Sequence, residues 1–409
     1  MNISTGASQP NGVRLVVLAN ILLWGIHIPI LQAGLVLQFL LTIFTGLRAG
    51  AMHRPLTIKI YIFLAVLILY GAGTYLFGPC TDQGVKFAAS LVMMVIMVAS
   101  LKWTASTVHW DAPLLTIRDA STMLGLMTTL ATIEFIIKFL SGTPLAEIRA
   151  AGIYLEPSHL ALSAAPLILY LWFCGASRTK FFVAISTFIL FVVAHSSTLI
   201  IILSVFFIIP FVGRLFKRPY NLYAIFSSVC LLASLLFIAA ISITEDTIIR
   251  FNDIIDLRAE SNVSSLVYAN GWQLLNSYLT STNGFGLGFN AMGCDPRSYT
   301  EATDWLELLQ LGEQNFNDGS FLFSKLGSEL GYAGIIFFVS LTVYSLHGLL
   351  FLSSMTTKPI FVLAIGWLAV ATFGGFIRSG GGYFSGPAIL GIFSFLILQN
   401  QRRKRFRKF

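Results

Sequence analysis

Charged residues are scarce in this chain of 409 residues: they make up 11% of it, against 56% for hydrophobic residues. A soluble domain carries about 25% charged residues, so this sequence has too few to cover a water-facing surface. Uncharged runs recur at lengths that suit a membrane-spanning helix, which needs roughly 20 residues. The shortage of charge excludes an ordinary soluble enzyme and predicts an all-α, polytopic membrane protein with a single membrane domain over residues 1–409.

Cysteine and histidine are few as well, with four and six residues respectively. No set of them has the ligand spacing of a zinc site, so we expect no metal site, and we expect no cofactor. The stretch Asn283-Gly284-Phe285-Gly286-Leu287-Gly288 imitates a dinucleotide fingerprint, but no βαβ unit surrounds it. We interpret it as a turn-rich crossing instead.

Hydropathy predicts about twelve transmembrane helices, at residues 13–28, 32–47, 56–77, 84–102, 114–138, 157–174, 180–195, 198–213, 221–243, 330–352, 359–377 and 386–400. Two apolar runs, 13–47 and 181–213, are each long enough to be one tilted helix, but both contain a break. The breaks are His27-Ile28-Pro29 and His195-Ser196-Ser197-Thr198. We interpret both runs as tight hairpins or interrupted helices, which are tolerated when buried in protein.

The lysines and arginines indicate which helix ends face the cytoplasm. With the N-terminus inside, only eight of the 26 basic residues fall on the outer side: Lys86, Lys138, Arg149, Arg250, Arg258, Arg297, Lys325 and Arg378. Every internal loop assigned to the inside then carries a basic residue, and both termini are expected to be cytoplasmic. The basic tail at 402–408 is typical of an anchor to anionic membrane lipid, so the net charge of +8 does not indicate a nucleic-acid partner.

This topology leaves one long outer loop, at about 244–316 between the ninth and tenth spans, which is too long to lack structure of its own. Apolar residues at helical spacing within 263–278 and 305–309 predict short helices, which we expect on the membrane surface above a cavity. Cys80 and Cys294 also fall outside, where an oxidising compartment would allow a disulfide between them. Two free thiols are the alternative, since spacing does not show the geometry.

Ionised side chains at the bilayer centre cost about 2.5–3.5 kcal/mol on insertion scales, so each is a functional candidate. Glu134 and Lys138 are four residues apart, and we expect them to pair with each other. Glu156 precedes Pro157, which suits the first helical position, so Glu156 is either a helix N-cap or a carboxylate that faces an outer cavity. His159 shares that helix face, as a satisfied core residue or a second catalytic candidate.

Three arginines lie at the outer membrane level, against the positive-inside trend. Arg250 and Arg258 are eight residues apart beyond the ninth predicted span, and Arg378 precedes three glycines that let backbone approach a ligand closely. Because the guanidinium fork suits phosphate oxygens, these arginines indicate an anionic ligand, with anchoring to lipid headgroups as the alternative. Asp318, either a helix cap or a further carboxylate of the site, opens a polar cluster that runs to Glu329.

In their order along the chain, these residues resemble the motifs of the O-antigen polymerase (Wzy) family of bacterial surface-polysaccharide assembly. The resemblance is carried by Tyr154–Leu162, His195–Thr198, Arg250, Arg258, Gly284–Gly288, Ser320, Glu329–Gly334, Arg378 and Gly382–Phe384. The related O-antigen ligases share this layout and carry a histidine–asparagine pair near the end of the long loop. Here the comparable place is Asn317-Asp318, without a histidine, which favours the polymerase over the ligase.

The resemblance implies a GT-C-like, metal-independent glycosyltransferase on the periplasmic face of a Gram-negative inner membrane. It implies that donor and acceptor are oligosaccharide repeat units linked to undecaprenyl pyrophosphate, and that a chain-length regulator (co-polymerase) is a partner. On this interpretation we assign pyrophosphate binding to Arg250, Arg258 and Arg378, base or acceptor binding first to Glu156 and then to Asp318 and His159, and sugar contacts to Tyr383 and Trp272. A lipid-linked-oligosaccharide transporter or flippase is the alternative from another class, although such carriers usually have short outer loops and internal repeats.

Overall fold

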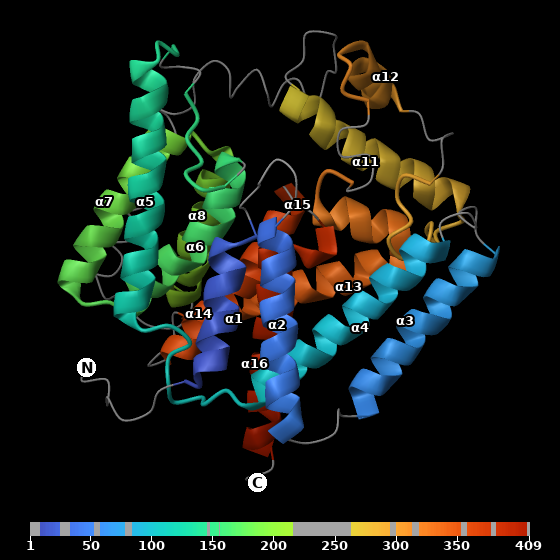
Figure 1. The fold of residues 1–409 in the computed structure, drawn as a ribbon, viewed down its shortest axis with the longest axis horizontal. Helices are drawn as coiled ribbons and strands as arrows, with labels where there is room; N and C mark the ends of the chain where they lie inside the picture. The colour runs from blue at the N-terminus through green and yellow to red at the C-terminus, as the bar shows by residue number, and fades with distance from the viewer. Residues whose placement is uncertain are drawn as a thin grey trace.

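The computed structural model describes residues 9–24, 33–52, 58–77, 84–144, 148–154, 156–215, 263–294, 300–312, 319–352, 358–377 and 382–406. All regular secondary structure in these residues is helical, as the sequence predicts. The helices pack side by side as a bundle, and two further helices lie across one end of it (Figure 1).

The helices before the predicted long loop are α1 (Asn11–Leu22), α2 (Ala33–Met52), α3 (Ile58–Phe77), α4 (Gly84–Ser106), α5 (Ile117–Leu140), α6 (Pro157–Cys174), α7 (Ser177–Ala194) and α8 (Ser197–Leu215). Within the loop lie α11 (Val263–Ser281) and α12 (Glu301–Leu308). After it come α13 (Leu322–Leu352), α14 (Pro359–Ala369), the π-helical turn η3 (Val370–Gly374), α15 (Gly375–Ile377), the 3₁₀ turn η4 (Gly382–Phe384) and α16 (Gly386–Phe406).

Six helices in the described ranges are long and apolar enough to cross a membrane: Gly84–Ser106, Ile117–Leu140, Pro157–Cys174, Ser177–Ala194, Leu322–Leu352 and Pro359–Ile377. Three shorter apolar helices accompany them, at Asn11–Leu22, Val36–Gly50 and Ser197–Gly213. Large apolar side chains on the outside of the bundle, such as Ile137, Phe188 and Ile336, are more than half exposed. Exposed apolar surface on this scale marks a face that meets lipid.

Helices coincide with eleven of the twelve predicted segments, and the remaining segment, 221–243, lies outside the described residues. The apolar runs 13–47 and 181–213 each contain two helices, and His195 between α7 and α8 has a left-handed backbone (φ +45°). The predicted start of the tenth span, residue 330, agrees with a break in α13: this helix begins at Leu322, but its backbone is interrupted at Gly331, and the part after the break matches the predicted span. Lys325 and Glu329 had the pattern of loop charges, but they pair with each other inside the helix.

The bundle has two distinct ends. The helices α11 and α12 form a roof over one end, and the start of α1 and the C-terminal end of α16 lie at the other (Figure 1). We call these the roof end and the termini end. At the termini end, Arg14 pairs with Asp119 at 2.7 Å, and Lys102 Nζ donates to Asn400 Oδ1 at 2.6 Å. Between the ends, α6 and α14 form the centre of the apolar core, where Trp367 is almost wholly buried.

The helix α13 is broken at Gly331, whose backbone (φ +58°, ψ −146°) is not helical. The break removes helical partners from nearby carbonyls, and the crossing, which we define as residues 282–292, replaces them. Three backbone hydrogen bonds of 2.9 Å run from Leu287 N to Ser328 O, from Gly288 N to Glu329 O and from Tyr332 N to Gly284 O. A broken helix at membrane depth needs such partners because lipid offers none. The glycine-rich stretch that imitates a nucleotide fingerprint is therefore a backbone clamp on α13.

Replacing Gly331 by alanine is expected to loosen this clamp. This backbone conformation, at positive φ and ψ near −146°, is adopted almost only by glycine and costs another residue about 1–3 kcal/mol, and the new Cβ would also overlap the carbonyl of Gly284. We expect a lower apparent melting temperature of the purified protein in detergent. Gly73→Ala in α3 is the matched control, because nothing lies within 4 Å of a Cβ there and alanine favours a helix. Equal melting temperatures for the two variants would contradict the clamp.

Candidate functional site

Four of the eight predicted site residues lie in the described part of the chain: Glu156, His159, Trp272 and Tyr383. The other four, Asp318, Arg250, Arg258 and Arg378, lie outside the described residues.

Glu156 is the N-cap residue of α6, with Pro157 at the first helical position, as predicted. Its side chain does not cap the helix, however. The backbone carbonyl of Glu156 accepts the amide of His159 at 3.0 Å, and the carboxylate oxygen Oε2 accepts the Ser158 hydroxyl at 3.0 Å. The half-buried carboxylate at the start of α6 therefore does not serve as the side-chain cap of that helix.

The imidazole of His159 lies against the indole of Trp24, with 4.7 Å between ring centroids. Trp24 follows the end of α1, and its Nε1 donates to Ser163 Oγ on α6 at 2.9 Å. Tyr154 completes the group, because its hydroxyl donates to the carbonyl of Ile21 at 2.8 Å. These contacts fix the start of α6 to the end of α1, so Glu156 and His159 have a rigid support.

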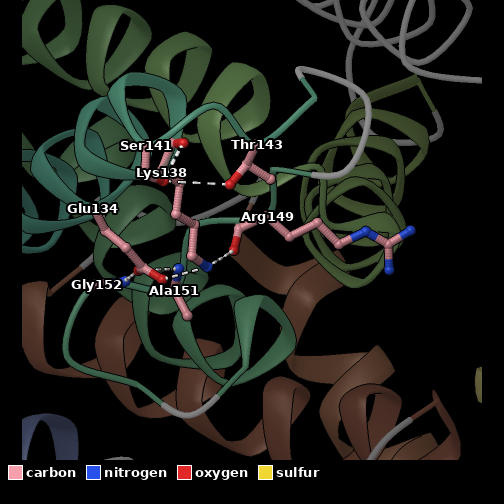
Figure 2. A network of polar contacts seen from close by, with 7 residues as sticks. All are labelled: Glu134, Lys138, Ser141, Thr143, Arg149, Ala151 and Gly152. Carbon is pink, nitrogen blue, oxygen red and sulfur yellow. Dashed lines mark hydrogen bonds and ion pairs between the residues drawn. The ribbon is translucent and has the colours of Figure 1, made fainter.

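The segment that leads to Glu156 is held on α5 by the predicted ion pair. Figure 2 shows Glu134 and Lys138, whose charged atoms are 2.7 Å apart, which confirms that prediction. Glu134 Oε2 also accepts the amides of Ala151 and Gly152 at 2.7 Å each, and Lys138 Nζ donates to the carbonyl of Arg149 at 3.0 Å. The side chain of Arg149 extends away from this network (Figure 2). The pair is structural, because it satisfies backbone groups of a segment without helical partners.

A buried ion pair lies in the first turns of α13, between Lys325 and Glu329. Its charged atoms are 3.1 Å apart, and the side chains are 3% and 0% exposed. Glu329 also accepts the amides of Asn290 at 2.7 Å and Met292 at 3.3 Å, and the hydroxyl of Tyr383 at 2.6 Å. Four donors thus converge on one carboxylate, which has about four acceptor positions. Glu329 is a saturated acceptor and has no position left to act as a base.

Tyr383, a predicted sugar contact, has its hydroxyl bound to Glu329 and its ring stacked on Phe289, with 5.0 Å between centroids and 16° between planes. Burial raises its pKa well above the ordinary value, and the neighbouring charge of Glu329 and the hydrogen bond to it raise it further. The phenol therefore remains a donor at physiological pH. Tyr383 is only 6% exposed and its hydroxyl is already bound, so its sugar contact stays a prediction that would need the ring to become accessible.

Trp272, the other predicted sugar contact, lies on α11 in the roof. Its indole is 38% exposed and packs beside Phe321 and Phe323, with centroids 5.1 and 5.5 Å away. Aromatic neighbours hold the ring while one side remains open. A partly exposed indole of this kind is suited to stacking on an apolar face of a sugar ring, and the sugar contact of Trp272 stays a prediction.

The two polar groups, at the start of α6 and at the start of α13, meet through α16. Gly386, the first residue of α16, lies directly against Trp24, because a Cβ there would be 2.6 Å from Trp24 Cγ. Three residues earlier, Tyr383 binds Glu329. Gln38 holds the same turn to α2, because its side-chain amide donates a hydrogen bond to the carbonyl of Phe384 at 3.3 Å. Glu156, His159 and Tyr383 are therefore connected through Trp24 and the turn before α16, whereas Trp272 lies apart from these contacts, beside Phe321 and Phe323.

Lys325 and Glu329 had no role assigned from the sequence. The sequence does show two oppositely charged residues, four positions apart, within an apolar stretch, and this pattern could have identified them. Cys294 is disulfide-bonded and Cys174 is a free thiol, while Cys80, the predicted partner of Cys294, lies outside the described residues. Among the residues that the structure describes, no group of three or more His, Cys, Asp or Glu could hold a metal ion.

Comparisons of the chain with protein-family models, with curated proteins and with solved structures found no match.

Proposed function

We propose that the chain is a membrane glycosyltransferase that polymerises oligosaccharide repeat units linked to undecaprenyl pyrophosphate, on the periplasmic face of a Gram-negative inner membrane. The proposal includes a twelve-span, GT-C-like topology with both termini in the cytoplasm and the roof outside. A co-polymerase that sets chain length is the expected partner.

The observation that supports this function most directly is the convergence at the roof end. The start of α6, with Glu156 and His159, and the start of α13, with the Lys325–Glu329 pair, are linked through Trp24 and the turn before α16, and such charges are costly inside a membrane. An amphipathic roof over the ends of spanning helices suits a substrate whose lipid lies in the membrane and whose sugars lie outside it. The resemblance to O-antigen polymerases in motif order adds to this argument.

The chemistry requires a hydroxyl to be activated and a diphosphate to leave. The acceptor hydroxyl oxygen forms a bond to the anomeric carbon of the donor sugar, and the bond from that carbon to the pyrophosphate oxygen breaks. The hydroxyl proton passes to Glu156, with His159 and Asp318 as the other candidates. Arg250, Arg258 and Arg378 would receive the negative charge that develops on the departing pyrophosphate. Trp272 and Tyr383 would hold sugar rings.

A transporter of lipid-linked oligosaccharide is the second candidate, because α13 is broken beside a buried ion pair. Discontinuous helices with ionisable residues are typical of transporter sites. The crossing argues against it, since all three backbone hydrogen bonds tie the break to another segment and leave it little freedom to move.

Complementation of a polymerase-deficient strain that makes the cognate repeat unit tests the function. We expect a ladder of lipopolysaccharide bands where the deletion strain shows core plus a single unit. Bare core in the deletion strain of the native host would indicate a ligase instead. Accumulation of repeat units on the cytoplasmic side of that strain would indicate a transporter.

A further inference from the structure

The ion pair between Lys325 and Glu329 is costly to bury, because both charges lose their water and apolar residues of the same size often stabilise a fold as well. The pair is nevertheless almost completely enclosed. Its presence therefore requires a reason beyond stability, and the donors that it gathers supply one.

The carboxylate of Glu329 connects three segments that are distant in sequence. The amides of Asn290 and Met292 belong to the crossing, the hydroxyl of Tyr383 belongs to η4, and Lys325 lies one turn earlier on α13. An apolar side chain at this position could hold none of these donors. A lysine here could not hold them either, since an ammonium group accepts no hydrogen bond.

Lys325 is itself enclosed by the same segments. Its ammonium lies 5.4 Å from the centre of the Tyr383 ring. Its stem packs on Gly382, where a Cβ would be 3.2 Å from Lys325 Cε. The lysine thus neutralises Glu329, and its stem fills the space beside Gly382. Both members of the pair contact η4, so η4 cannot shift without disturbing the pair.

The crossing has its own ties to α4. Asn290 Nδ2 donates to Ser90 Oγ at 2.6 Å, and Lys86 Nζ donates to the carbonyl of Met292 at 3.1 Å. Glu329 therefore joins α4, by way of the crossing, to the turn that leads into α16. That turn ends at Gly386, against Trp24, which is the neighbour of His159.

We propose that Glu329, with Lys325 as its counter-ion, is a positioning residue that fixes the crossing and η4 relative to each other at the roof end. It does not touch substrate; it holds Tyr383 and the start of α16 in the arrangement that glycosyl transfer uses. This inference rests on the proposed function. The charge of the pair is secondary, and the acceptor atoms at position 329 are what the site requires.

Two double variants separate positioning from charge balance. Lys325→Met/Glu329→Gln is neutral and close in volume, but it loses acceptor capacity at position 329. Lys325→Glu/Glu329→Lys keeps the opposite charges and directs an ammonium at three donors. The control, Ser345→Ala/Thr372→Val, removes a buried hydrogen bond of 2.9 Å between α13 and η3. Each protein is compared at equal amounts of folded, monodisperse material.

We expect kcat for chain extension to fall on the order of 10²-fold in both pair variants, with KM for the lipid-linked donor changed less than about threefold. Amide hydrogen exchange in the crossing should become at least about tenfold faster, as measured by mass spectrometry. The control should lose thermal stability but keep kcat and the exchange rate of the crossing.

Recovery of kcat in the charge-swapped variant would show that the pair only balances charge, and it would overturn the proposal. An unchanged exchange rate in both pair variants would overturn it too. If neither pair variant accumulates, Tyr383→Phe removes one hydroxyl and no charge; a tenfold loss of kcat supports the proposal, and a full rate contradicts it. Absence of chain extension by the wild-type protein would remove the proposed function alone, because the exchange measurement still decides whether Glu329 fixes the two segments.

Discussion

Glu156→Gln is expected to slow chain extension by about 10²–10⁴-fold, which is the range that a general acid or base contributes. Glutamine has nearly the same shape but cannot take a proton from the acceptor hydroxyl. The fold should persist, because the carboxylate does not cap α6 and an amide oxygen can still accept the Ser158 hydroxyl. Initial rates of extension and a size-exclusion profile of the same preparation measure the two effects separately.

Two other carboxylates provide controls for this variant. Glu307 lies exposed on α12 in the roof, so Glu307→Gln should keep both rate and stability. Glu134 accepts two backbone amides and pairs with Lys138, so Glu134→Gln should lower the melting temperature far more than Glu156→Gln does. If Glu156→Gln extends chains at the wild-type rate, the base is a different residue, and His159 and Asp318 are next to be tested.

Arg258→Ala and Arg378→Ala are each expected to abolish long-chain polymer in a deletion strain while the protein still inserts into the membrane. Removing one preorganised donor from a developing negative charge costs about 10²–10³-fold in rate, and chain growth multiplies that loss over every added unit. The banding pattern of lipopolysaccharide, with immunoblots of the membrane fraction, is the measurement. The same experiment with Arg250→Ala completes the set.

Lysine replacements distinguish phosphate binding from lipid anchoring. Arg378→Lys keeps the charge but not the two-pronged fork, so it should recover only part of the polymer if the group binds pyrophosphate. A residue that anchors to lipid headgroups would work equally well as lysine, and its alanine variant would lower the amount of inserted protein instead. Arg178→Ala, on an exposed arginine at the start of α7, should have no effect on the banding pattern.

The sequence predicted most helices correctly because membrane helices are set by local hydropathy. The helical segment of α13 before its break, residues 322–330, was not predicted, because Lys325 and Glu329 look too polar for a span, yet they neutralise each other at i, i+4. A hydropathy profile counts the cost of burying each charge separately, and it does not take account of two opposite charges that neutralise each other. The same pair was therefore overlooked as the organiser of the roof end.

Other features depend on contacts that no local pattern contains. The glycines of the crossing predict a turn, but its backbone also exchanges hydrogen bonds with α13 about 40 residues later in the chain, with Leu287 and Gly288 as donors and Gly284 as acceptor. Pro157 correctly predicts Glu156 as the N-cap residue, but the sequence does not show that the Glu156 carbonyl accepts the amide of His159 while its side chain binds Ser158. The meeting of His159 and Tyr383 through Trp24 and α16 likewise joins segments from the two halves of the chain.

Reconstitution tests the central claim, which is that sugars are joined at the roof end with release of a lipid diphosphate. Purified protein in liposomes would receive the lipid-linked repeat unit from outside, and the products would be resolved by mass spectrometry. We predict lipid-linked oligomers of two or more repeats, with one undecaprenyl pyrophosphate released for every bond formed. Movement of the intact lipid-linked unit across the bilayer, with no release of undecaprenyl pyrophosphate, would contradict the account.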